Sequence, residues 1–364
     1  MKKNNNIKSD PFTRTPGVAG SAYIDMHIVD EIVSSFTSNE SFKYIYRIVG
    51  VRGSGKTVVF ARTLKKFKEM NNWLVYSLSA AGNPTTALIA KLSSEKIIDL
   101  SKVKTTMQAT LGAEGNVGVL KGSALLSMTR EKEKKDVIYS EEAILDELIE
   151  KIKQKGRKIL IGIDDISRTN EIVKFLSIIG KYLIEEDSSI YFICTGLSKN
   201  IEDFSKEKNL TFFKRSDTIE INQLSKYEIA EKYRHFLGVS DDEAARLAKF
   251  VKGYAYAYQV LGSLYFTRNN ETEEEIIQEF EKILFQDSYD LIWKSLTSSE
   301  KDFVKVILNS TGEIKDIKQK MKNSSNLSVL RDRLIKKHIV NARERGLLSI
   351  ELPRFKEYVS RWDD

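Results

Sequence analysis

The chain has 364 residues, 41% of them hydrophobic and 30% charged, and its formal net charge is +7. These values are typical of a soluble globular protein with room for two or three domains, and the mild positive charge permits a nucleic-acid partner without requiring one. The single cysteine excludes an intramolecular disulfide and a cysteine-based zinc site, and no apolar run approaches the ~18 residues of a membrane span.

Two further absences bear on location and on metal binding. The three histidines, His27, His235 and His338, lie far apart in the sequence, so a histidine metal centre is not expected. The first ten residues are polar and basic without a following apolar core, so they do not form a secretory signal. We therefore expect a cytoplasmic protein with no membrane partner.

Residues 50–57 read GVRGSGKT and fit the phosphate-binding loop pattern, in which two glycines flank four residues and a lysine and a threonine follow. The preceding segment, 42–49, predicts a buried strand, and 58–70 predicts an amphipathic helix. Backbone N–H groups and a helix N-terminus would then bind the phosphates of ATP, with Lys56 on the β and γ oxygens and the Thr57 hydroxyl on Mg²⁺. An ordinary glycine-rich turn is the alternative. The predicted nucleotide-binding residues of this loop are Gly50, Arg52, Gly53, Ser54, Gly55, Lys56, Thr57 and Val58.

Strands that alternate with helices predict a three-layer α/β domain with a parallel sheet. Further strands are expected at 73–78, 158–163, 190–196 and 218–222, and helices at 23–36, 141–154 and 170–186, with another opened by Asn83 and Pro84. A glycine-rich stretch at 112–128 breaks the alternation and indicates a β-hairpin or flexible insertion. It could contact a substrate or neighbouring subunit, or simply cover a sheet edge.

Asp165, Thr195 and Arg215 are candidates for catalysis beside Lys56, and Asp164 is a candidate Mg²⁺ ligand. Asp164 would hold Mg²⁺ opposite Thr57, and Asp165 follows where many such ATPases place a general base, although two adjacent acids could also form a solvated turn. Thr195 ends the next strand and could bond the γ-phosphate or the attacking water. Arg215 precedes the fifth strand and could face the γ-phosphate of a neighbouring subunit, or belong to a surface pair with Lys214.

From residue 225 the strand signal stops, and helical patterns at 225–237, 241–251, 256–266 and 272–285 predict a helical lid. The last part predicts a winged helix. A capping box at 297–300 precedes a helix with Phe303, Val306 and Ile307, helices at 314–321 and 325–337 follow, and a strand pair is expected at 339–340 and 347–351. This domain would bind double-stranded DNA or, alternatively, a protein. The predicted DNA-binding residues are Asn326, Ser328, Arg331, Arg333, Lys336, Lys337, Arg343 and Arg345.

Together these motifs resemble the AAA+/STAND superfamily of P-loop ATPases, and most closely the archaeal-type and origin-initiator-like members with a helical lid and a C-terminal winged helix. GVRGSGKT and the IGIDD of residues 161–165 are similar to the Walker A and B motifs, and Thr195 to the sensor-1 position. The stretch 253–262 looks like the lid motif of STAND proteins. The implied division is 1–43 for a lead-in and helix, 44–221 for the ATPase core with an insertion at 101–136, 222–290 for the lid and 291–364 for the winged helix.

The sequence also departs from the family pattern. The lid helix at 256–266 contains no arginine or lysine, so a sensor-2 arginine is missing, which favours the STAND side. Tyr23 and Ile24 occupy the place of the family's base-binding aromatic box, but the arginine of that box is absent. No effector domain follows the predicted winged helix, so we expect any effector to be a separate chain.

The combined expectation is a Mg²⁺-dependent ATPase that acts as a molecular switch, forms a homo-oligomer with ATP and engages DNA through its winged helix. The alternative is a slowly hydrolysing regulatory or sensor ATPase, related to defence or mobile-element control, that recruits a protein partner instead of DNA.

Overall fold

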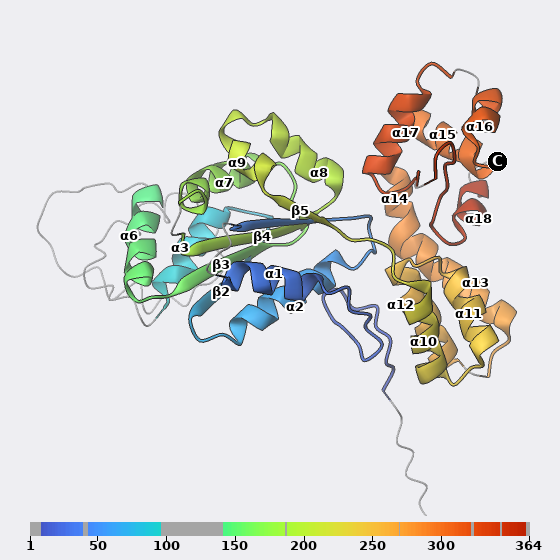
Figure 1. The fold of residues 1–364 in the computed structure, drawn as a ribbon, viewed down its shortest axis with the longest axis horizontal. Coiled ribbons are helices and arrows are strands. Elements are labelled where there is room, and N and C mark those ends of the chain that lie inside the picture. The colour runs from blue at the N-terminus through green and yellow to red at the C-terminus, as the bar shows by residue number, and fades with distance from the viewer. Residues whose placement is uncertain are drawn as a thin grey trace, which may run out of the picture.

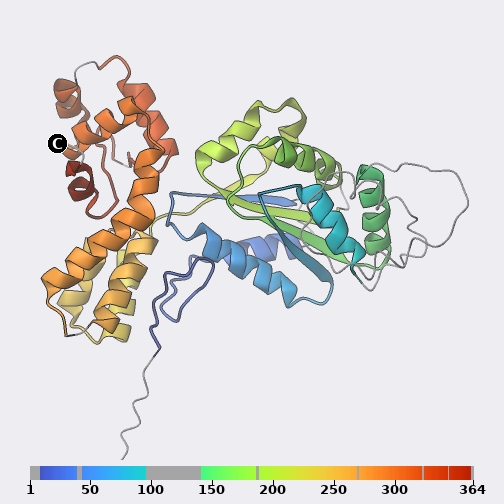
Figure 2. The same cartoon turned by 180° about the vertical axis from the view of Figure 1, so that it is seen from behind.

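The computed structural model describes residues 9–38, 43–95, 141–185, 188–268, 270–321, 324–342 and 344–361. The insertion predicted at 101–136 and the candidate Arg343 lie outside these ranges. An α/β part and a helical part stand side by side, joined by the chain that leaves β5 and by the N-terminal segment (Figures 1 and 2).

The α/β part is built on a parallel sheet of five strands in the order β2-β3-β4-β1-β5. The strands are β1 (Ile45–Val49), β2 (Trp73–Leu78), β3 (Lys158–Ile163), β4 (Ile190–Gly196) and β5 (Asp217–Glu220). The predicted three-layer α/β core is thus confirmed. Because parallel strands end at a common edge, the segments that follow β1, β3 and β4 meet there.

Two hydrophobic clusters lie on opposite faces of the sheet. One contains α1 (Ile28–Thr37) and α2 (Lys56–Lys68), and the other contains α3 (Pro84–Ser93), α6 (Glu141–Gln154), α7 (Asn170–Leu183), α8 (Ser198–Asp203) and α9 (Thr211–Arg215). Short 3₁₀ turns, Phe204–Lys206 and Lys208–Leu210, connect α8 to α9. Along β4, Phe192 and Cys194 belong to one cluster and Tyr191 and Ile193 to the other, so a fully buried strand still alternates between faces.

A local sequence signal explains where α3 begins. The Asn83 side chain accepts hydrogen bonds from the N–H groups of Thr85 and Thr86 and caps α3, as predicted.

On β3, Gly162 leaves room for the Phe60 ring of α2, because a Cβ there would lie 2.8 Å from that ring. The phosphate-loop helix is therefore pressed directly against the strand that carries the paired acids.

The predicted helices of the lid are α10 (Lys226–Leu237), α11 (Asp241–Phe250), α12 (Ala255–Thr267) and α13 (Glu273–Leu284). The chain then continues through a π-helical segment, Phe285–Tyr289, into α14 (Asp290–Lys294). This helical run crosses residue 290, where the sequence predicted a domain boundary, and that boundary stays a prediction.

The C-terminal part consists of α15 (Ser298–Leu308), α16 (Ile314–Lys320), α17 (Leu327–Lys336) and α18 (Phe355–Ser360). The capping box of Thr297 and Glu300 is present at the start of α15. The predicted strand pair is wrong in extent: in the described parts of 339–351, Asn341 pairs with Ser349 only as an isolated bridge. Pro353 lacks an N–H and Arg354 is left-handed at φ 57°, so the extended segment ends and α18 begins.

One hydrophobic cluster runs through the lid and the C-terminal part and also includes Phe12 and Ile24 of the N-terminal segment. The Phe12 ring packs where a side chain at Gly262 of α12 would otherwise lie. The Thr13 N–H donates to Gln259 at 2.8 Å. The N-terminal segment thus belongs to the lid, whereas the α1 that follows it belongs to the sheet.

Candidate functional site

The loop between β1 and α2 presents an open helix N-terminus. Gly53 and Gly55 have φ angles of 77° and 101°, which residues with side chains rarely adopt. No side chain caps α2. Among the described residues, the backbone N–H groups of Lys56 and Thr57 have no main-chain acceptor. Such free donors, added to the helix dipole, favour an anion at this position.

Lys56 is a buried cation without a carboxylate partner in the described part of the chain. Its side chain is 9% exposed, and Nζ donates to the carbonyls of Gly50 and Val51 at 3.0 and 2.9 Å. Burial lowers the pKa of Lys56 to about 8, while the charges of Asp165 and Asp164 act in the opposite direction. A polyphosphate would supply the missing countercharge.

Asp164 and Thr57 form the expected pair at the end of β3. The Thr57 hydroxyl donates to Asp164 Oδ2 at 3.0 Å. Hydroxyl and carboxylate oxygens suit Mg²⁺, which commonly combines one or two protein ligands with water and substrate phosphates. The described residues contain no cluster of three or more histidine, cysteine, aspartate or glutamate side chains. The Thr57 hydroxyl and the Asp164 carboxylate are thus groups that fit a Mg²⁺ ion.

Thr195 connects the two acids. Its hydroxyl donates to Asp164 Oδ1 and accepts the backbone N–H of Asp165 at 2.8 Å, and the residue is 1% exposed. Asp165 itself is exposed and left-handed at φ 52°. Because the one proton of Thr195 is already donated to Asp164, a bond from Thr195 to a γ-phosphate would require this hydroxyl to turn. That role stays a prediction, as does the role of Asp165 as a base.

Arg215 lies at the end of α9 and is exposed to solvent. Arg47 on β1 fixes the backbone on both sides of it, donating to the carbonyls of Lys214 and Ser216 at 3.3 and 2.5 Å. Among the described residues, the Arg215 side chain has no hydrogen bond or ion pair. It is thus available to a neighbouring molecule, and its role there stays a prediction.

The structure does not bring the Tyr23 and Ile24 side chains to the phosphate loop through any described contact. Tyr23 lies 4.4 Å from the Arg62 guanidinium on α2, and Ile24 is 4% exposed within the lid cluster. The same segment does pass the first turn of α2, because a Cβ at Gly17 would lie 3.6 Å from Thr57 Cγ2. Base recognition by Tyr23 and Ile24 stays a prediction.

Contacts between the lid and the loop were not predicted from the sequence. The Tyr254 hydroxyl donates to the Arg52 carbonyl at 2.7 Å, and the Tyr256 N–H donates to the Gly53 carbonyl at 3.0 Å. The stretch 253–262 resembles a family lid motif, but that resemblance does not specify these contacts. Neither hydrogen bond has a local sequence signal, because the partners are about 200 residues apart.

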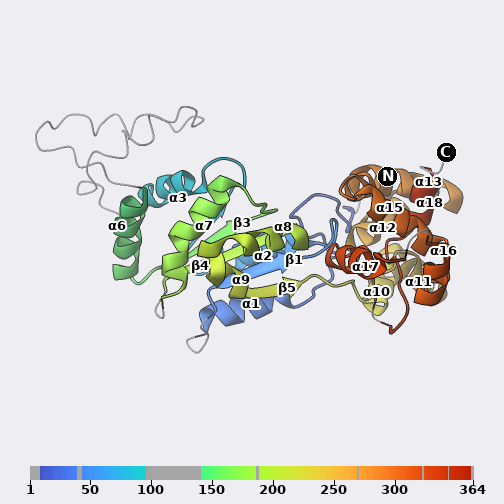
Figure 3. The same cartoon turned by 90° about the horizontal axis from the view of Figure 1, so that it is seen from above.

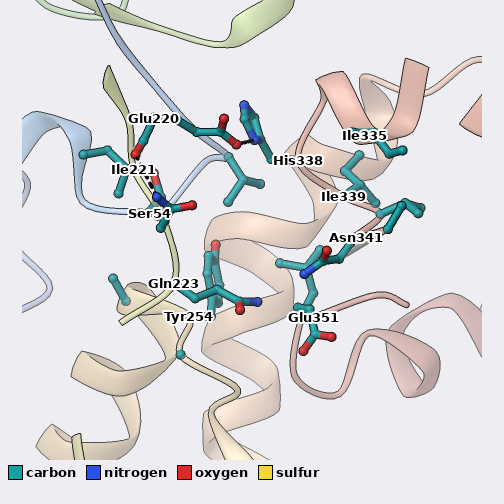
Figure 4. A pocket seen from close by; sticks show the side chains of 17 residues that line it. Ser54, Glu220, Ile221, Gln223, Tyr254, Ile335, His338, Ile339, Asn341 and Glu351 are labelled. Carbon is teal, nitrogen blue, oxygen red and sulfur yellow. Dashed lines mark hydrogen bonds and ion pairs between the residues drawn. The ribbon is translucent and has the colours of Figure 1, made fainter. Parts of the chain in front are cut away.

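A cavity of about 430 Å³ adjoins the loop on its β5 side, between Val51, Ser54, the residues after β5 and the segment after α17. The Ser54 hydroxyl on its wall is buried and has no hydrogen-bond partner among the residues that the structure describes. Figure 4 shows Glu220 and His338 pointing toward one another across this space. His338 Nδ1 lies 2.7 Å from Glu220 Oε1, and Nε2 lies 2.6 Å from Ser198 Oγ. Burial lowers the pKa of His338 despite the Glu220 carboxylate.

The residues predicted to bind DNA differ in their surroundings. Lys337 donates to Glu300 at 2.7 Å inside the C-terminal part, and its side chain is 14% exposed. Lys336 pairs with Glu202 of α8 at 2.7 Å, and Arg331 pairs with its neighbour Asp332. Four of the candidates are exposed, and their side chains make no hydrogen bond or ion pair among the described residues: Asn326, Ser328, Arg333 and Arg345. Their contact with DNA stays a prediction.

The α17 helix lies on the side of the C-terminal part that faces the α/β part (Figures 1 and 3). The contacts of Lys336 and His338 with Glu202, Ser198 and Glu220 hold it there.

No helix in the described ranges combines the length and apolar character needed to cross a lipid bilayer.

The chain is similar in fold to solved P-loop ATPases. A Walker-type ATPase of Pyrococcus abyssi superimposes over 96% of this chain and 99% of its own, with a TM-score of 0.62 and 14% identity. The ORC2 protein of Aeropyrum pernix, solved as ADPNP–ADP complexes, matches over 92% of this chain and 91% of its own, with a TM-score of 0.54 and 12% identity. A model described as a domain of unknown function, DUF8462, matches residues 286–359. No curated protein matches the sequence.

The strand order, the loop geometry and these likenesses define the class: this chain has the fold of a P-loop ATPase of the AAA+ type. The resemblance found in the sequence is confirmed at the level of the fold.

Proposed function

We propose that this protein binds ATP with Mg²⁺, hydrolyses it and uses the nucleotide state as a switch. The observation that carries the proposal is Lys56, a buried ammonium whose partners are main-chain carbonyls, set beside free N–H groups at the start of α2. This arrangement carries positive charge that a triphosphate would complement.

Each residue of the site has a distinct proposed role. Gly53, Gly55 and the start of α2 bind the phosphates through their backbone, and Lys56 exchanges its carbonyl partners for phosphate oxygens. Thr57 and Asp164 would hold Mg²⁺, whose positive charge would offset that of the phosphates. Asp165 accepts a proton from the attacking water. Thr195 keeps both acids in place.

Mutation of the two central residues tests this proposal. Lys56→Ala should abolish nucleotide binding measured by calorimetry, because it removes the buried cation that we propose binds the β and γ oxygens. Asp165→Asn should keep binding within a few fold but stop phosphate release, because an amide cannot take the proton. Unchanged hydrolysis in both variants would rule the proposal out.

We further propose that ATP promotes a homo-oligomer in which Arg215 contacts the nucleotide of the next subunit. Its exposure, and the support of its backbone by Arg47, are consistent with this role. Mass photometry with ADP, ATP and a slowly hydrolysed analogue tests whether the mass of the assembly depends on the nucleotide.

The proposal also keeps the division of the chain into a lead-in (1–43), core (44–221), lid (222–290) and winged helix (291–364).

Engagement of double-stranded DNA by the winged helix is the third part of the proposal, and a protein partner is its rival. The rival is favoured by a specific observation: Lys336 and His338 already make protein contacts, with Glu202, Ser198 and Glu220 of the α/β part. If the protein captured an effector protein in a nucleotide-dependent manner and caused no mobility shift of duplex DNA, the regulatory function would be supported instead.

A further inference from the structure

Tyr254 joins the phosphate loop to the lid through a directional pair of hydrogen bonds. The residue is 4% exposed, and its hydroxyl donates to the Arg52 carbonyl at 2.7 Å. The same hydroxyl lies 2.6 Å from Ser288 Oγ. Because the phenol has one proton and the carbonyl can only accept, Ser288 must be the donor to Tyr254. The order Ser288 to Tyr254 to Arg52 polarises both bonds in the same direction.

The lid also holds the next carbonyl of the loop. The N–H of Tyr256 donates to the Gly53 carbonyl at 3.0 Å. In a trans peptide the N–H points opposite to the C=O, so fixing the Arg52 carbonyl toward the lid turns the N–H of Gly53 away from it. This N–H has no main-chain acceptor among the described residues. The lid therefore determines which way a free donor of the loop points.

The fit between the two elements is also steric. Gly53 has φ 77°, and a Cβ on it would lie 2.2 Å from the Tyr254 hydroxyl and 3.0 Å from Tyr256 Cβ. The glycine thus serves the lid contact as well as the loop conformation. Any larger residue would push the loop and the lid apart.

Ser288 links this contact to the C-terminal part. It lies in the π-helical segment Phe285–Tyr289, a rare geometry often found at functional positions. The neighbouring Tyr289 stacks on Tyr254 with ring centroids 6.4 Å apart, and its hydroxyl donates to the Pro353 carbonyl at 2.6 Å. The position of Tyr254 therefore depends on how the lid meets the C-terminal part.

We propose that Tyr254 is a positioning residue for the nucleotide: its hydroxyl fixes the peptide between Arg52 and Gly53 so that the Gly53 N–H is ready to bind a phosphate. This inference rests on the proposed function, because it concerns the same loop. It predicts that the lid prepares the loop for the nucleotide before the nucleotide binds.

The test compares two variants that each remove one buried phenol hydroxyl. Tyr254→Phe keeps the ring but leaves the Arg52 carbonyl and Ser288 without their partner. We expect the Kd for a slowly hydrolysed ATP analogue to rise roughly tenfold. Hydrogen exchange at residues 51–55 of the nucleotide-free protein should also become faster. The matched control is Tyr233→Phe, because Tyr233 is fully buried in the lid and donates to the Tyr258 carbonyl at 2.9 Å, away from the loop.

The control should lower the melting temperature by a similar amount yet leave the Kd and the loop exchange unchanged. If wild type binds and Tyr254→Phe binds equally well with unchanged exchange, the inference is overturned and the proposed function stands. Equal weakening by both variants would also overturn it, as a general loss of stability. If wild type binds no nucleotide, the proposed function and the inference fall together.

Discussion

At the scale of single residues, Lys56 links nucleotide affinity to pH. Burial lowers its pKa from 10.5 to about 8 in the nucleotide-free protein. Bound phosphates would stabilise the ammonium form, so binding should take up a proton once the pH exceeds about 8. We expect the affinity to fall by roughly tenfold per pH unit above that value. Calorimetry in buffers of different ionisation enthalpy measures the proton uptake.

The lowered pKa of Lys56 also makes the stability of the nucleotide-free protein depend on pH. This stability should rise with pH, whereas the nucleotide affinity should fall. The folded state binds fewer protons than the unfolded state between about pH 8 and 10.5. Lys56 therefore reduces stability below about pH 8, and this penalty disappears as the pH rises through that window. If the nucleotide affinity were the same at every pH and binding took up no proton, the assignment of Lys56 to the phosphates would be contradicted.

Discrimination between ATP and ADP needs more than Lys56. Moving a two-state equilibrium from 1:99 to 99:1 takes about 5.5 kcal/mol of differential affinity. A hydrogen bond to a charged group contributes about 1.5–3 kcal/mol. About two to four contacts specific to the γ-phosphate are therefore required. Asp165 through water and Arg215 are candidates, and so is Thr195 if its hydroxyl turns away from Asp164.

Sequence reasoning located the residues that belong to contiguous motifs. GVRGSGKT and the two acids after β3 could be predicted because their geometry follows from a strand, a turn and a helix that are adjacent in the chain. Tyr254 and His338 could not, because their partners lie 202 and 140 residues away. A buried tyrosine or histidine has no local signal that specifies which carbonyl or carboxylate it will meet.

At the scale of secondary structure, the prediction was accurate where local caps determine the ends. The capping box of α15 and the asparagine cap of α3 are both present. The short helices α8 and α9, of six and five residues, carry too little periodicity to be recognised. The strand pair of the predicted wing was overestimated because pairing depends on a partner rather than on the segment itself.

The surroundings of α17 separate a structural lysine from a candidate DNA contact. Burial raises the pKa of Glu300, but Lys337 and the Thr297 backbone lower it below the ordinary value. Lys337→Ala would leave this carboxylate buried without its cation, and we expect a loss of about 3 kcal/mol of unfolding free energy. Urea denaturation measures it.

Arg333→Ala should behave differently, because this side chain is exposed and has no hydrogen bond or ion pair among the described residues. We expect stability to change little, while affinity for duplex DNA falls and the slope of log affinity against log salt becomes shallower by about 0.9. Arg345→Ala is the parallel case. If the slope of log affinity against log salt were unchanged in both variants, DNA contact by Arg333 and Arg345 would be contradicted.

At the scale of the whole molecule, three contacts hold α17 against the α/β part. They are Ser198 with His338, Glu220 with His338, and Glu202 with Lys336. The Glu202 and Glu220 side chains are more than half exposed, and burial lowers the pKa of His338, so that ring is mostly neutral. The ion pair of Glu202 with Lys336 and the hydrogen bond of Glu220 with His338 therefore each contribute little. The helix should therefore leave the α/β part at modest cost when a ligand competes for it.

Weakening these contacts should make α17 more accessible. We expect the double variant Ser198→Ala and Glu220→Gln to increase the radius of gyration in small-angle scattering. Its affinity for duplex DNA should rise a few fold, since less of the binding free energy is then spent on separating the two parts. The matched control is Glu243→Gln, which removes an exposed pair with Arg246 inside the lid. Expansion without any gain in DNA affinity would mean that DNA does not use the face of α17 turned toward the α/β part, and would favour a protein partner.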